Sequence, residues 1–241
     1  MPSPLLVPAS LLNLLVLGVA LVASRRQLAA LVPRGRRERD ALLLVLALAL
    51  LVRVANPFRP LPWMAEGFYA DQTEGMLIYR LNGICSTGEM VESRRPFSLF
   101  LPLGERGMCR QFAVFYPSGY PFMLAIASSL LGFGTAVPRV LGVLGGTLTV
   151  ALTYLLARAL TRDDRVALTA ALVLALLPMH VRFGVKMLSE VFSVLVEVLA
   201  VLAAVVHVRS QRSTLGWLVA SALAFHITVR RENPIAAIPI L

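Results

Sequence analysis

The chain has 241 residues, of which 58% are hydrophobic and 15% are charged, and its mean hydropathy is +0.77. A soluble domain carries about 45–50% apolar and about 25% charged residues, so this composition excludes a soluble globular protein and indicates an integral membrane protein. The net charge of +10 does not indicate nucleic-acid binding, because the basic residues punctuate apolar helices and form no single stripe.

Six apolar segments are predicted to cross the membrane, since a helix needs about 20 residues for that purpose. The first, within residues 1–24, lacks the basic start and the cleavage site of a signal peptide and is expected to remain as a helix. The charge-free run 41–52 is short, so its helix must take in flanking residues, with Arg53 either reaching the interface or turned into the protein. The later spans are predicted at 138–160, 165–180, 187–208 and 214–229.

The basic loops predict the orientation of these spans. Loop 24–40 carries six arginines and two acids, so the positive-inside rule places it in the cytoplasm and the N-terminus outside. The next helix then delivers the chain to a polar segment, 56–112, on the outer side. That segment holds six of the thirteen acids and six arginines.

The later loops fix the remaining orientation. The basic sequence HVRSQRS (207–213) and the charged turn TRDDR (161–165) are expected at cytoplasmic ends. By parity, the apolar stretch 113–133 cannot then be a full span and should lie in the outer leaflet. Its sequence YPSGYP (116–121) carries the prolines and glycine typical of a break. An ordinary spanning helix remains the alternative for this stretch.

This topology brings charged residues from separate segments to one face of the membrane, as a site at the bilayer surface requires. Carboxylates there could act as acid or base, and cations could bind phosphate. The residues are Glu66, Asp71, Glu74, Arg139, His180, Arg182, Lys186, Glu190, Arg230, Arg231 and Glu232.

Several other motifs have structural interpretations. Cys85 and Cys109 fall in the oxidising outer segment, where both a disulfide and two free thiols are possible. Asp163-Asp164 could chelate a metal, but its predicted cytoplasmic position favours an N-cap of the following helix. The GxxxG spacing of 142–146 favours close helix packing. Glu190 and Glu197 share one helix face, and Glu190 lies nearer the outer mouth.

Four ordered stretches together resemble a known family. They are AEGFYAD (65–71), YPSGYPFMLAIASSLLGFGTAVPRVLGVLGGTLTVALTYLLARAL (116–160), ALTAALVLALLPMHVRFGVKMLSEVF (167–192) and TVRREN (228–233). In order and spacing they are similar to the membrane core of polyprenyl-phosphate-dependent glycosyltransferases of the GT-C fold, which include protein mannosyltransferases and aminoarabinose transferases. The resemblance spans about residues 41–241.

The resemblance implies a set of site residues. The family carries an Asp-Glu pair in its first outer loop, and here the pair falls on Ala65-Glu66, so the catalytic carboxylate is expected at Glu66 or else at Asp71. The expected donor-phosphate ligands are Arg139, Arg230, Arg231 and Lys186. The residues expected to bind the acceptor or to shape the site are Glu190, Tyr69 and Tyr116.

The resemblance also implies the fold, the function and the location. We expect an all-α polytopic membrane protein, with an N-terminal helix and basic loop in 1–40 and a GT-C-like core in 41–241 whose outer loop, 56–136, contains membrane-lying helices. It would transfer a sugar from a polyprenyl-phosphate donor to an acceptor outside the cytoplasm, in a bacterial inner membrane. Membrane lipids are expected partners and nucleic acid is not. No cofactor is assigned, and a divalent metal is left open.

Two alternatives to an active transferase stay open. One is a transport or assembly protein that binds polyprenyl lipids without chemistry, and the other is an inactive or fragmentary relative. Members of the family are longer, and the sequence stops within an apolar stretch, NPIAAIPIL (233–241). We therefore expect a fragment of a longer protein; if the 241 residues are the whole protein, a non-catalytic or partner-dependent role gains weight over a complete donor pocket.

Overall fold

The fold is known from a computed structural model of the chain. The structure describes residues 6–56, 69, 73, 84–86, 108–110, 119–132, 136–186 and 189–230. Its helices are α1 (Leu6–Ala29), α2 (Arg36–Ala55), α5 (Gly119–Leu131), α6 (Ala136–Thr161), α7 (Asp164–Leu176), α8 (Pro178–Phe183), α9 (Glu190–Ser210) and α10 (Ser213–Val229). Two short strands, β1 (Ile84–Ser86) and β2 (Met108–Arg110), pair antiparallel.

The helical content confirms the predicted all-α membrane fold, to which the two strands add one small hairpin. Three described helices are long and apolar enough to cross a membrane: α1 from Leu11 onward, α6 and α9. α2 reaches 20 residues because it takes in Arg36 to Asp40 at its N-terminal end and Arg53 to Ala55 at its C-terminal end. The short run 41–52 is therefore extended on both sides, as predicted.

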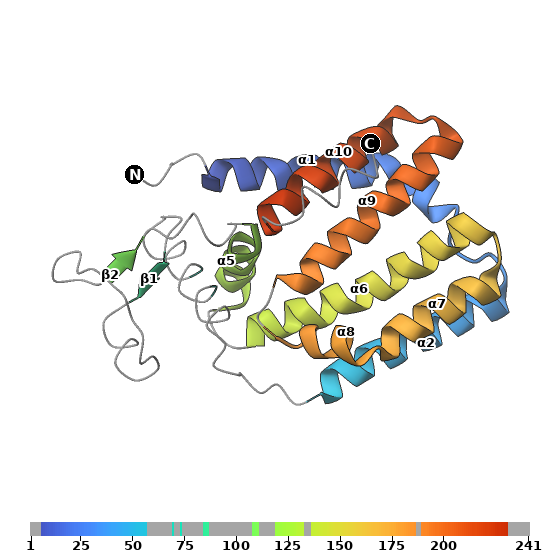
Figure 1. Cartoon of the computed structure of the whole chain (residues 1–241), viewed down its shortest axis with the longest axis horizontal. Coiled ribbons are helices and arrows are strands. Elements are labelled where there is room, and N and C mark those ends of the chain that lie inside the picture. Colours follow the sequence, from blue (N-terminus) through green and yellow to red (C-terminus); the bar gives the residue numbers. More distant parts are fainter. Residues whose placement is uncertain are drawn as a thin grey trace.

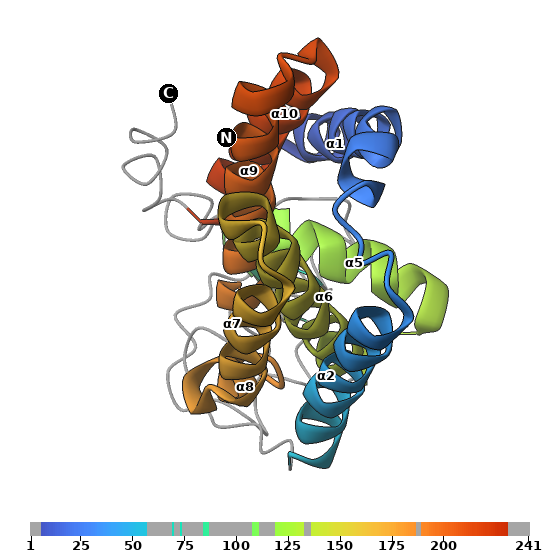
Figure 2. The same ribbon diagram turned by 90° about the vertical axis from the view of Figure 1, so that its right-hand side faces the viewer.

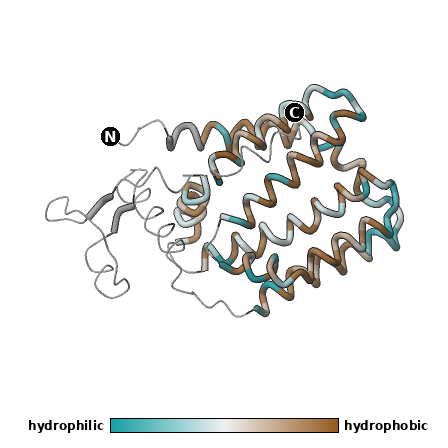
Figure 3. Tube along the Cα trace, in the orientation of Figure 1, coloured by the Kyte–Doolittle hydropathy of each residue, from teal (hydrophilic) through white to brown (hydrophobic). Residues whose placement is uncertain are grey.

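The described helices run back and forth between two ends of the bundle (Figure 1). The basic end holds the connections 30–35, 162–163 and 211–212. The distal end holds the C-termini of α2 and α10, the N-termini of α6 and α9, and helices α5 and α8. Polar residues gather at these ends, and apolar residues dominate the helix bodies (Figure 3). The three basic connections thus share one end, as the positive-inside interpretation requires.

α5 lies across the distal end of the bundle. It has 13 residues, too few to cross the hydrocarbon core, and it packs against α6, α10 and α1. Figures 1 and 2 show that it runs across the direction of α6. This agrees with the prediction that 113–133 does not contain a full span.

The predicted span 165–180 is broken into two helices. α7 ends at Leu176, Leu177 has extended backbone, and Pro178 begins α8. Proline is favoured in the first turn of a helix, because it has no backbone N–H to be satisfied there. The break sends α8 and the chain after it across the distal end toward α9 (Figure 1).

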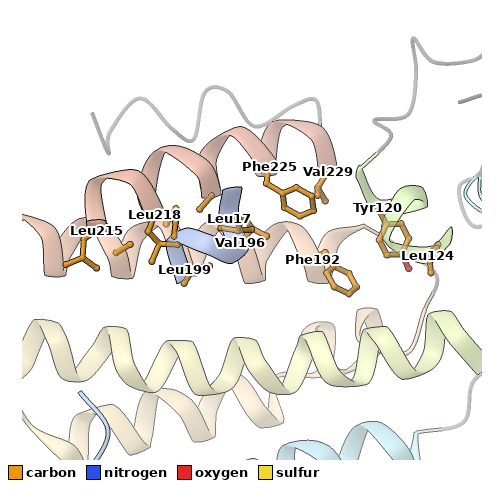
Figure 4. Close-up of a cluster of buried hydrophobic side chains, with 14 of the residues drawn as sticks. Leu17, Tyr120, Leu124, Phe192, Val196, Leu199, Leu215, Leu218, Phe225 and Val229 are labelled. Atoms are coloured by element: carbon orange, nitrogen blue, oxygen red, sulfur yellow. The ribbon is translucent and has the colours of Figure 1, made fainter. Parts of the chain in front are cut away.

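The core consists of two clusters. In the first, α9 and α10 pack with α1, α5 and Tyr69 (Figure 4). In the second, α2, α6 and α7 pack through Val45, Ala49, Val150, Tyr154 and three alanines of α7. α6 and α9 lie against each other and join the two clusters.

The glycines at 142–146 confirm the predicted close packing. A Cβ on Gly142 would lie 2.4 Å from the carbonyl oxygen of Gly184, and one on Gly145 would lie 3.3 Å from Val191. One surface of α6 therefore contacts both α9 and the segment that precedes it.

The strands place the two cysteines of the chain opposite each other. In the β1–β2 register, Cys85 pairs with Cys109. Directly opposed residues of antiparallel strands have Cα atoms about 4.5–5.5 Å apart, which is within the range that a disulfide spans. The register therefore favours the disulfide over two free thiols.

We expect Cys85 and Cys109 to be oxidised to a disulfide in the mature protein. In denatured membranes, a maleimide–polyethylene glycol reagent should label the chain only after reduction. Cys85→Ser should expose one thiol, which should react without reduction. Labelling of the unreduced wild-type chain at two sites would contradict the pairing.

Candidate functional site

Arg53 is the centre of a buried polar cluster at the distal end. Its side chain is fully buried in the last turn of α2. Nη1 donates to the carbonyl of Ala49 at 2.8 Å and lies 3.5 Å from that of Ala175, while Nη2 donates to His180. The sequence left two alternatives for Arg53, and the structure shows the second: the side chain is turned into the protein.

Two glycines make room for this arginine. A Cβ on Gly146 would lie 2.6 Å from Nε of Arg53, and a Cβ on Gly184 would lie 3.3 Å from the same atom. The guanidinium thus links three segments of the chain that are far apart in sequence: α2, the middle of α6 and the residues that follow α8.

His180 completes this cluster from α8. Because an arginine can only donate, Nδ1 of His180 accepts at 2.5 Å. His180 lies beyond the spanning helices, and its burial, followed by the charge of Arg53, lowers its pKa to about 4. The imidazole is therefore neutral at pH 7 with its proton on Nε2. That nitrogen is buried without a hydrogen-bond partner in the described residues.

Tyr69 connects the acidic stretch 65–75 to the distal end of the bundle. Its side chain is 5% exposed, and its hydroxyl lies 2.9 Å from the hydroxyl of Ser189. Its ring packs edge-on against Tyr120 of α5 at 5.1 Å, and Tyr120 packs on Phe192 of α9 at 5.5 Å. The structure therefore buries Tyr69 between α5 and α9.

Thr73 strengthens this connection. It is fully buried, and its hydroxyl donates to the carbonyl of Tyr69 at 2.6 Å. A hydrogen bond from residue i to the carbonyl of residue i−4 is typical of a helical turn. The described residues of the stretch therefore enter the core through a polar and an aromatic contact.

Glu190 lies beside this contact, at the first residue of α9. Its Oε2 atom is buried and has no hydrogen-bond partner among the described residues. A buried acceptor without a partner costs about 1–3 kcal/mol, and more when it is charged. This carboxylate is therefore placed to accept a hydrogen bond from a bound molecule.

Three expected phosphate ligands have described positions at the distal end. Arg139 is half-buried in the first turn of α6 and donates to the carbonyls of Val54 at 2.8 Å and Asn56 at 3.4 Å. Lys186 is 6% exposed. Arg230 is half-buried at the end of α10. Arg139 therefore stabilises the C-terminus of α2, in addition to any role toward a ligand.

The remaining predicted site residues lie outside the described ranges of the chain. They are Glu66, Asp71, Tyr116 and Arg231.

The aspartate pair at 163–164 has a structural role at the basic end. Asp163 accepts a hydrogen bond from the backbone N–H of Arg165 at 2.7 Å and caps α7, which confirms the predicted N-cap. Asp164 forms an ion pair with Arg158 at 3.2 Å and accepts from the Tyr154 hydroxyl at 2.6 Å. Within the described ranges, no group of three or more His, Cys, Asp or Glu residues could hold a metal ion.

A comparison with protein-family models identifies the fold and the general chemistry. Residues 116–241, more than half of the chain, match the model described as dolichyl-phosphate-mannose-protein mannosyltransferase. The chain belongs to this mannosyltransferase family. It is therefore a membrane glycosyltransferase of the GT-C type. No curated protein and no solved structure gave a match.

The matched region contains most of the candidate-site residues at the distal end of this mannosyltransferase-family protein. It includes α5, Arg139, His180, Ser189 and Glu190, whereas Arg53 and Tyr69 precede it. Sequence reasoning placed His180 among the residues of the outer face but did not assign Arg53, Tyr120 or Ser189 to the site. An arginine that ends an apolar run was a usable signal for Arg53, since charges within spans usually face the protein interior. No comparable signal marked Ser189.

Proposed function

We propose that this protein transfers a sugar from a polyprenyl-phosphate-linked donor to an acceptor outside the cytoplasm. The observation that carries the proposal is the contact between Tyr69 and Ser189. It ties the acidic stretch 65–75 to the N-terminus of α9, where Glu190 has a buried carboxylate oxygen without a described partner. Cationic Arg139 and Arg230 lie at the same end of the bundle.

The proposed reaction needs few protein groups. An acceptor hydroxyl attacks the anomeric carbon of the sugar, the bond between that carbon and the phosphate oxygen breaks, and the polyprenyl phosphate leaves with the bonding electrons. Glu66 would take the proton of the acceptor hydroxyl. Arg139, Lys186, Arg230 and Arg231 would offset the charge on the departing phosphate.

Tyr69 limits how far Glu66 can lie from this site. Three residues of chain reach at most about 11 Å, so we expect Glu66 within that reach of Tyr69, beside the N-terminus of α9. Glu190 would accept a hydrogen bond from a hydroxyl of the sugar or of the acceptor. Tyr116 would line the same site from the segment that precedes α5.

The positions of the buried charged residues favour transfer over transport. A transport path would need charged side chains along the depth of the bilayer, whereas the buried Arg53 and Lys186 lie toward the distal end of the bundle, with His180. The other buried polar side chains among the described residues are serines, threonines and His226, and some of them, such as Ser24 and Thr149, lie away from that end. Deeper in the membrane, Ser193 bonds His226 at 2.8 Å across α9 and α10. That pair closes a helix–helix interface.

The basic end supports an assignment of the two sides. If the loops 30–35, 162–163 and 211–212 lie in the cytoplasm, the distal end faces the outside. In a bacterium this would be the outer side of the inner membrane, where lipid-linked sugars would be presented. Residues 1–40 at the N-terminus would add a helix and a basic loop to a core in 41–241.

The function is tested with purified protein in liposomes and a panel of radiolabelled short-chain polyprenyl-phosphate sugars. We expect the wild-type protein to release polyprenyl phosphate from at least one donor in the presence of an outer-envelope extract as a source of acceptors. If the folded protein consumes none of the donors, the proposed function is wrong.

Glu190→Gln tests the role of the buried carboxylate in the same assay. Loss of a hydrogen bond to a charged group costs about 1.5–3 kcal/mol, so we expect the rate to fall about 10- to 100-fold. Glu197→Gln is the matched control, since it lies about two helical turns deeper on α9 and should keep nearly the wild-type rate. Equal losses in both variants would indicate a general effect of removing charge from α9.

A further inference from the structure

Two cavities lie beside α1. The first, of about 510 Å³, is lined among the described residues by α1 alone, from Leu14 to Ala23. The second, of about 330 Å³, lies at the basic end, between α1, α6 and α9. Positions four apart on a helix advance by about 40° around its axis, so Gln27 in the second cavity lies on another side of α1 than Leu15 in the first.

The first cavity suits a hydrocarbon chain. Its described lining residues are Leu14, Leu15, Gly18, Val19, Val22 and Ala23, all without a polar side chain. Val19 is 70% exposed in the bundle, although an apolar side chain is stabilised by contact with other apolar groups. In a membrane, a lipid chain would make that contact.

The second cavity has polar groups and lies at the basic end of the bundle. Its apolar walls are Ala30, Leu31, Ala159 and Val206, and its polar residues are Gln27, Arg209 and Ser210. The Oε1 atom of Gln27 is buried and has no hydrogen-bond partner in the described ranges. It is an acceptor and requires a donor from a bound molecule.

Arg209 supplies the charge at this position. Nη2 of Arg209 donates to the carbonyl oxygen of Leu160 at 3.4 Å. This bond uses one of the five N–H donors of the guanidinium. The side chain is exposed at the end of α9. The arginines of α1, Arg25 and Arg26, lie in the same end of the bundle and add to the positive potential.

A cavity between helices that combines apolar walls, a cation and an unpaired acceptor has the chemistry of a lipid site. Basic pockets between helices on the cytoplasmic side attract anionic headgroups. We propose that the second cavity binds an anionic glycerophospholipid. Its phosphate contacts Arg209, a headgroup hydroxyl donates to Gln27 Oε1, and the start of an acyl chain packs on Leu31, Ala159 and Val206.

This site is separate from the proposed transfer site, which lies at the other end of the bundle. α1 packs mainly on α10. A bound lipid would add contacts between the C-terminal end of α1 and helices α6 and α9. Bound lipid should therefore stabilise the position of α1.

The proposal is tested by native mass spectrometry and thermal unfolding of the delipidated full chain. We expect dioleoyl phosphatidylglycerol to bind at least about tenfold more tightly than dioleoyl phosphatidylcholine and to raise the melting temperature. Arg209→Gln should remove this preference, and Gln27→Leu should weaken phosphatidylglycerol binding. Arg212→Gln removes an exposed charge nearby that does not line the cavity, so it should bind as wild type does.

Other outcomes overturn the proposal. If Arg209→Gln and Arg212→Gln lose the preference for phosphatidylglycerol equally, the preference comes from the overall surface charge and not from the cavity. Equal affinity for phosphatidylglycerol and phosphatidylcholine would show that the cavity does not recognise the lipid headgroup. Displacement of the lipid by inorganic phosphate alone would indicate a simple anion site. Tighter binding of a polyprenyl phosphate than of phosphatidylglycerol would assign the cavity to the donor lipid. None of these measurements depends on transfer activity.

Discussion

Replacing Glu66 by glutamine is expected to lower the rate of sugar transfer at least about 100-fold while the protein stays folded. A positioned general base contributes about 10²–10⁴ to a rate, and glutamine cannot accept the proton. The measurement is the initial rate of polyprenyl-phosphate release in liposomes, with the melting temperature as the test of folding. Asp40→Asn, whose side chain at the basic end is 58% exposed, is the control and should keep the wild-type rate.

Asp71→Asn separates the two candidates for the base. The resemblance would put the family's Asp-Glu pair on Ala65-Glu66, without its aspartate, and Asp71, two residues after Tyr69, is the alternative candidate. We expect Asp71→Asn to reduce the rate less than Glu66→Gln does. If Glu66→Gln is fully active and Asp71→Asn is inactive, the role of base belongs to Asp71.

Replacing Gly142 by alanine is expected to destabilise the protein by about 3 kcal/mol, at the upper end of the usual cost of overpacking. The new Cβ would lie 2.4 Å from the carbonyl oxygen of Gly184, so the backbone of one segment has to move. The measurement is the midpoint of thermal unfolding in detergent, followed by size-exclusion chromatography.

Gly18→Ala is the matched control for this substitution. Gly18 also lies within a helix, but no atom outside its own helix backbone lies within 4 Å of its added Cβ. Since alanine favours a helix over glycine by about 1 kcal/mol, the control should melt at or above the wild-type temperature. If Gly142→Ala melts with the control, the contact between α6 and the segment at 184–186 is not as close as described.

The helices and their order could be predicted from the sequence, because they depend on local properties. Apolar runs and basic loops predicted that the described helices alternate between two ends with the basic connections together, and the Asp163 cap follows from the preference of aspartate for that position. The break at Leu177–Pro178 was missed, since the prediction continued the helix to 180. A proline there was a visible signal for the start of a new helix.

The site could be predicted only partially, because its contacts join distant segments. The sequence singled out Glu190 as a candidate because an acid at the mouth of a span is costly, and the structure buries one of its carboxylate oxygens. The burial of Arg53 depends on Gly146 and Gly184, and the pairing of Tyr69 with Ser189 depends on where α5 lies. Neither arrangement is encoded in a pattern near the residue itself.

The contact between α1 and α10 has a consequence for how the protein is made. α1 is among the first described segments to leave the ribosome, and its main partner, α10, is the last described helix. The residues of α1 that contact α10 therefore face lipid until nearly the whole described chain has been synthesised. α1 is apolar enough to remain in the membrane during that interval. Its docking should be a late, post-insertion step of assembly.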